Sequence, residues 1–124
     1  MLTVLLGSAL MMQGFQCASK EIASAKNAMY NLKDNDKAMT YLNTEVAKNP
    51  TSGEAYLLQA KIYMERKQYT ETAAALVNAE KYIKDPKLLV DKQIIISKFL
   101  KEINGEIASD MKKGSISKKT AGYL

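Results

Sequence analysis

The sequence feature that most restricts the fold is a repeat. When the chain is aligned with itself so that residue 25 matches residue 59, and every later residue is matched at the same offset, small and apolar side chains come into register. The matched pairs are Ala25 with Gln59, Lys26 with Ala60, Met29 with Tyr63, Ala38 with Thr72, Tyr41 with Ala75, and Leu42 with Leu76. The better-formed unit covers residues 53–84, and a weaker copy covers about residues 19–52. A period of this length is typical of stacked supersecondary units, which bury their apolar sides against one another.

Within the second unit, the spacing indicates two helices separated by a tight turn. Tyr56, Ala60 and Tyr63 recur at i, i+4 and i+7, so they share one face of a helix over about residues 53–66. A second helix is predicted over residues 69–83. Since the turn between them is so short, the two helices are expected to pack antiparallel.

Helix breakers mark the ends of this unit. Pro50 cannot continue the helix before it, and Asp85 and Pro86 suit the N-cap and first position of a further helix. That helix is predicted over residues 87–104, with the C-cap at Asn104-Gly105. It is interpreted as a degenerate third unit or a capping helix. Because about three repeats are generally needed for a stable stack, we expect some apolar surface to remain uncovered.

The composition agrees with an all-α fold. Straight-chain helix formers and alanine are plentiful, and proline occurs only at positions 50 and 86. No long stretch alternates apolar with polar residues as a half-buried strand would.

On these residues the chain resembles the tetratricopeptide repeat (TPR) family. The matching positions are Ala38, Leu42 and Pro50 in the first unit, and Ala55, Tyr56, Ala60, Tyr63, Tyr69, Leu76 and Ala79 in the second. Asn35, Gln59 and Thr72 depart from the usual pattern. The resemblance implies antiparallel helix-turn-helix repeats in a TPR-like α-solenoid, with about two repeats and a C-terminal capping helix over residues 18–110. An ordinary helical hairpin bundle with the same faces is the alternative.

The resemblance also implies a concave groove, lined by the first helix of each unit, that binds a peptide or protein. The groove positions would be Ala23, Asn27 and Tyr30 in the first unit and Leu57, Lys61 and Met64 in the second. Asn27 matches one member of the carboxylate clamp of some TPR proteins, but the other members are missing, so no clamp is predicted. Packing against a neighbouring helix is an equally open interpretation of Leu57 and Met64.

The residue inventory argues against catalysis. The chain has no histidine and one cysteine, which removes the usual general base and a thiolate zinc cluster. Its six glycines form no phosphate-binding loop. The segment Asp34-Asn35-Asp36 lacks the downstream glycine and glutamate of a calcium loop, and a turn between helices is the better interpretation. We therefore predict a protein that is not an enzyme and that needs no cofactor or metal.

Residues 1–17 resemble an export signal. The first nineteen residues carry no charge, and the apolar run over residues 4–12 has the length of a signal-peptide core but is too short for a comfortable membrane span. The lone Cys17 stands where a bacterial lipoprotein signal would place its lipidated cysteine, although Gln16 departs from that pattern. An incidental thiol beside an ordinary cleaved signal is the alternative. The missing positive residues before the core suggest a start codon upstream of Met1.

The excess positive charge lies in a short C-terminal segment. The net charge is +5, and residues 111–124 contribute four lysines and no acid. The rest is nearly neutral, so no nucleic-acid partner is predicted. A solvated tail is the preferred interpretation of these residues, with weak contact to anionic lipid as the alternative.

The expected protein is thus a non-catalytic interaction or scaffold module of the bacterial cell envelope, either facing the periplasm or anchored to the outer membrane through Cys17. A self-associating structural protein that forms homo-oligomers, or a fragment or accessory subunit of a larger TPR protein, are the alternatives.

Overall fold

The computed structural model describes residues 19–112, and throughout this part of the chain the secondary structure is helical with no strand. The helices are α2 (Lys20–Tyr30), α3 (Asn35–Lys48), α4 (Gly53–Glu65), α5 (Tyr69–Tyr82) and α6 (Pro86–Lys112). The all-α prediction is confirmed. The chain divides into two compact units, one ending at Glu45 and the other beginning at Val46.

The first unit contains α2 and most of α3, joined by a short turn. Ser19 caps α2, because its Oγ accepts a hydrogen bond from the backbone N–H of Ile22 at 3.1 Å. The same hydroxyl donates to Oε2 of Glu45 near the far end of α3, at 2.7 Å. The start of α2 therefore lies beside the end of α3, and the two helices run antiparallel.

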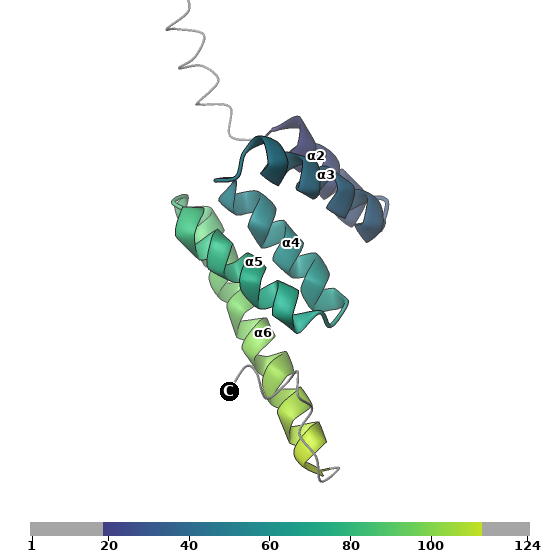
Figure 1. Ribbon diagram of the computed structural model, residues 1–124, viewed down its shortest axis with the longest axis vertical. Helices are drawn as coiled ribbons and strands as arrows, with labels where there is room; N and C mark the ends of the chain where they lie inside the picture. The colour runs from purple at the N-terminus through teal and green to yellow at the C-terminus, as the bar shows by residue number, and fades with distance from the viewer. Residues whose placement is uncertain (1–18, 113–124) are drawn as a thin grey trace, which may run out of the picture. The chain divides into compact units, whose positions relative to one another are not determined.

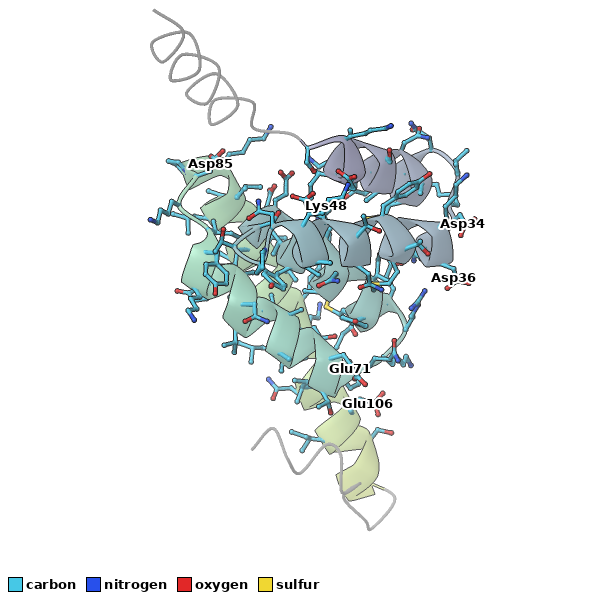
Figure 2. The ribbon with its side chains drawn as sticks, turned by 45° about the horizontal axis from the view of Figure 1, so that its top comes forward. Asp34, Asp36, Lys48, Glu71, Asp85 and Glu106 are labelled. Atoms are coloured by element: carbon cyan, nitrogen blue, oxygen red, sulfur yellow. The ribbon has the colours of Figure 1, made fainter. Side chains whose placement is uncertain are left out.

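The turn between α2 and α3 ends at Asp34. The carboxylate of Asp34 accepts a hydrogen bond from the backbone N–H of Lys37 at 2.9 Å. Asp34 and Asp36 stand at the start of α3 (Figure 2), where an acidic side chain interacts favourably with the helix dipole. Of the segment interpreted as a turn between helices, Asp34 therefore lies in the turn, whereas Asn35 and Asp36 form the start of α3.

In the second unit, α4 and α5 form an antiparallel hairpin, and α6 packs along both of them (Figure 1). Their contact buries an apolar cluster: Leu57, Ala60, Met64, Tyr69, Ala75, Leu76, Ala79, Ile83, Ile95, Phe99 and Ile103. The rings of Tyr69 and Phe99 lie 6.2 Å apart between centroids, in a tilted arrangement that aromatic pairs favour. The predicted turn at residues 67–68 is confirmed by the interval between α4 and α5.

Close packing at the start of α4 requires a glycine. A Cβ atom built on Gly53 would lie 2.7 Å from Cγ1 of Ile83 and 2.8 Å from its backbone nitrogen. The absence of a side chain at Gly53 therefore lets the start of α4 approach the end of α5.

The sequence period is visible in the backbone. Helices α3 and α5 each have 14 residues. The first and last residues of α5 match the first and last residues of α3 at the same offset that aligns residue 25 with residue 59. The turn before each helix contains a lysine in the left-handed region, Lys33 with φ 54° and Lys67 with φ 56°. A non-glycine residue with positive φ is uncommon, so its recurrence at the same offset is a specific sign of repeated local structure.

The prediction for α6 is right at its start and wrong at its end. Asp85 caps the helix, because its Oδ1 accepts from the backbone N–H of Lys87 at 2.9 Å. The predicted helix over residues 87–104 was to stop at Asn104-Gly105, but α6 continues to Lys112. The contacts beyond Gly105 explain the difference, since Ile107 packs against the core and Glu106 lies 4.0 Å from the amino group of Lys67.

Candidate functional site

Three of the residues predicted to line a groove lie on α2 in the first unit. Ala23 and Asn27 are exposed, and Tyr30 is 48% exposed. Asn27 lies one helical turn before Asn31, and its Oδ1 accepts a hydrogen bond from Nδ2 of Asn31 at 2.7 Å. This pair fixes the orientation of the Asn27 amide on an accessible surface.

The other three predicted groove residues lie on α4 and differ in burial. Leu57 and Met64 are only 2% and 8% exposed and belong to the core cluster that joins α4 to α5 and α6. Core packing, one of the two interpretations of these residues, therefore describes their state in this structure. Lys61, on the same helix, is half-buried.

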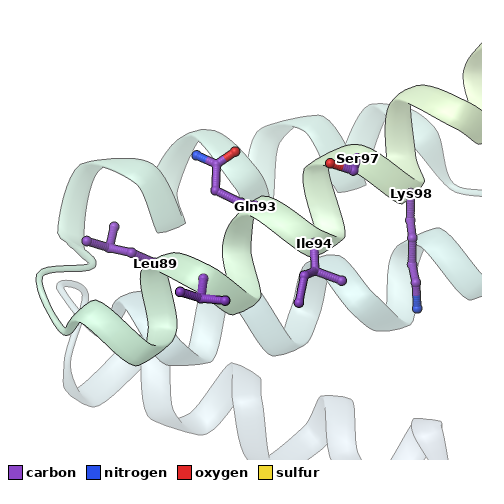
Figure 3. Close-up of a pocket in the computed structure, with 6 residues that line it drawn as sticks. Leu89, Gln93, Ile94, Ser97 and Lys98 are labelled. Carbon is purple, nitrogen blue, oxygen red and sulfur yellow. The ribbon is translucent and has the colours of Figure 1, made fainter.

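Sequence reasoning anticipated uncovered apolar surface but did not locate it. Part of it lies on α6, where Leu89, Val90 and Ile94 are 36%, 61% and 51% exposed. With Gln93, Ser97 and Lys98, these side chains line an open hollow (Figure 3). All six described lining residues come from one helix, so the hollow lies along a helix face.

Two buried charged residues were not anticipated by the sequence patterns. Lys92 on α6 is 3% exposed, and its Nζ pairs with the carboxylate of Glu80 on α5, whose side chain is largely exposed. Such an arrangement is typical of a long lysine stem that is buried while its charged end meets a partner. Glu45 is 4% exposed and accepts the hydrogen bond from Ser19. Each of these charged groups is satisfied by a contact that joins two helices.

The described residues contain no cluster of three or more His, Cys, Asp or Glu side chains that could hold a metal ion. No helix within residues 19–112 is long and apolar enough to cross a membrane. The export segment with Cys17 and the lysines at positions 113–119 lie outside the described residues.

Comparison with known proteins gave no relative. No family model matches the chain, and neither the curated proteins nor the solved structures include a match.

Proposed function

We propose that this chain is a non-catalytic module of TPR-like helical repeats that binds a protein or peptide partner. The observation that carries the proposal is the recurrence of α3 in α5 at the period of the sequence repeat, together with the left-handed lysine before each helix. The spacing of the two helices is that of consecutive tetratricopeptide repeats.

The accessible surface of α2 supports binding by the first helices of the units. Asn27 and Lys61 occupy equivalent positions, one repeat apart, on α2 and α4. An amide, a lysine and the exposed ring of Tyr30 offer hydrogen bonds, a positive charge and an apolar face. This chemistry suits an extended or helical peptide with both apolar and acidic side chains.

The cellular location of the protein is part of the same proposal and depends on residues 1–17. Export to the bacterial cell envelope follows from the apolar run before Cys17, and anchoring would require acylation of that cysteine. Mass spectrometry of the protein from the native cell tests both, because acylation adds the mass of the chains to a product that begins at Cys17.

A photo-crosslinking experiment in the native cell tests the binding surface. A photoreactive amino acid is placed at Asn27 or Lys61 on the predicted groove. The matched controls are Asn43 and Val77, an equivalent pair of exposed positions on α3 and α5. We expect the same protein to be captured from both groove positions and from neither control.

The identified partner is then titrated against the purified chain. Lys61→Glu should weaken binding, because it reverses the charge that α4 would offer to an acidic partner, whereas Val77→Lys should leave it unchanged. Equal capture from all four positions, or no weakening by Lys61→Glu, would contradict the proposed function.

A further inference from the structure

Helix α6 has two apolar faces, and the hairpin covers only one of them. Ile95, Phe99 and Ile103 are buried in the core of the second unit. Ile94 is 51% exposed. At about 100° per residue, it lies about 140° around the helix from the centre of the buried face, near Phe99. Val90, one turn earlier, is 61% exposed on the same side. The outer side of α6 therefore presents apolar side chains to solvent over more than one turn.

On one flank of this face the charged residues follow an alternating order, and the exposed Lys101 lies on the face itself, two turns after Ile94. Lys87, Asp91, Lys98 and Glu102 follow one another along one flank of α6 with spacings of four, seven and four residues. Lys87, Lys98 and Glu102 are exposed, and Asp91 is half-buried. The order of signs is plus, minus, plus, minus. Read in the reverse direction it is minus, plus, minus, plus, so each charge can face an opposite charge on an antiparallel copy of the helix.

This charge order selects one occupant for the face. A second copy of α6 laid antiparallel, with its Ile94 close to Ile94 of the first copy, brings Asp91 opposite Lys98 of the second copy. The same register brings Lys87 opposite Glu102 of the second copy and Leu89 opposite Leu100 of the second copy. A parallel two-fold pairing would instead set this charged flank opposite the other flank, where Leu89 and Leu100 lie, and would leave the charges without partners of opposite sign.

We propose that the outer face of α6, defined by Leu89, Val90, Gln93, Ile94, Ser97 and Lys98, docks a second copy of this chain in an antiparallel, two-fold contact. From Lys87 to Glu102 the contact extends about 22 Å along the helix. A stable interface buries about 800 Å² per partner, more than a single helix face of this length provides. The dimer is therefore weak and depends on protein concentration.

This inference is independent of the proposed function, because the outer face of α6 shares no residue with the predicted groove. Loss of the dimer would leave partner capture from Asn27 and Lys61 intact, and loss of partner capture would leave the dimer intact. The two failures can thus be told apart.

Sedimentation of the purified full chain over a range of concentrations measures the dimer. The informative variant is Ile94→Glu, which places two carboxylates face to face at the two-fold axis. It should raise the dimer dissociation constant at least about tenfold, because the carboxylates would lose water without gaining partners. The matched control is Val77→Glu, the same kind of change on the exposed face of α5. It should leave the dissociation constant unchanged, which also corrects for any association through residues 4–12.

Charge reversal tests the register. Asp91→Lys and Lys98→Asp should each weaken the dimer about two- to tenfold, since each opposes like charges at two symmetric places. The double variant restores opposite charges across the two-fold axis and should return the dissociation constant to that of the wild type. Additive weakening in the double variant would overturn the antiparallel register.

A disulfide test does not depend on affinity. In a Cys17→Ser background, Ile94→Cys should form a covalent dimer under mild oxidation much faster than Val77→Cys, because the new thiols meet at the two-fold axis. A chain that is monomeric at every concentration, or equal crosslinking from the two positions, would overturn the proposal.

Discussion

The sharpest test of the packing compares one substitution at two glycines of the second unit. Gly53→Ala adds a Cβ atom that would lie 2.7 Å from Cγ1 of Ile83 and 2.8 Å from its backbone nitrogen, with the carbonyl carbon of Tyr82 at 3.0 Å. Two of these neighbours are backbone atoms, so relief requires α4 to move away from the end of α5. Overpacking of this kind costs about 1–3 kcal/mol.

Gly105→Ala should have the opposite sign. Gly105 lies inside α6, and a Cβ atom there would meet nothing within 4 Å. Alanine is favoured over glycine in a helix interior by about 0.8–1.0 kcal/mol, and no steric cost opposes this gain. The same chemical change is therefore expected to destabilise the chain at one position and to stabilise it at the other.

Urea denaturation followed by circular dichroism at the helical minimum measures both effects. With the slope m unchanged, a shift of the midpoint reports the change in unfolding free energy. For a domain of this size, 1 kcal/mol corresponds to about 4–8 °C in Tm. A Gly53→Ala protein as stable as the wild type would refute the close approach of α4 to Ile83. A destabilising Gly105→Ala would refute the continuous path of α6.

Substitutions at three further positions test single contacts. The unfolding free energy of Lys92→Met, measured in urea, should stay within about 1 kcal/mol of the wild type, because the apolar stem is kept and the ion pair with the largely exposed Glu80 contributes little. Lys92→Ala should lower that free energy by about 2 kcal/mol or more, since it leaves a cavity at a buried position. Asp85→Ala should cost about 1 kcal/mol through loss of the α6 cap, also measured in urea. Ser19→Ala should cost about 2 kcal/mol, because it removes the cap of α2 and the donor to Glu45, and faster hydrogen exchange of the α2 amides should report it. Unchanged exchange in α2 would mean that Ser19 does not hold the two helices.

The helices of the repeats could be predicted from the sequence because independent signals agree there. The register between Leu42 and Leu76 predicted similar helices, and both lie buried in α3 and α5. Asp85-Pro86 combines a capping side chain with a residue whose φ is preset for a first turn, so the start of α6 was clear. Local chemistry favours such features independently of tertiary contacts.

The end of α6 could not be predicted from local chemistry. Asn104-Gly105 favours a C-cap in isolation, but the packing of Ile107 outweighs the cost of about 1 kcal/mol for a glycine inside a helix. The burial of two of the predicted groove residues could not be read from the sequence for a related reason. Periodicity assigned Leu57 and Met64 to a face of α4, but how deeply they are buried depends on how closely α5 and α6 pack against that face, which the spacing within α4 does not specify.

The outer face of α6 could not be located from the sequence for the same reason. Leu89, Val90 and Ile94 look in sequence like the apolar residues of any amphipathic helix. Only the position of α6 against the hairpin decides which of its apolar residues are buried and which remain exposed.

The cap at Ser19 has a consequence for how the chain could be tethered. The Ser19 hydroxyl accepts a hydrogen bond from the backbone of Ile22 and donates one to Glu45, so both helices of the first unit are tied to this residue. Were Cys17 the acylated terminus, Ala18 alone would separate the lipid from the fold. Two residues of extended chain span at most about 7 Å. The anchor would then keep the first helical unit close to the bilayer surface, whereas a long tether would let it diffuse away from that surface.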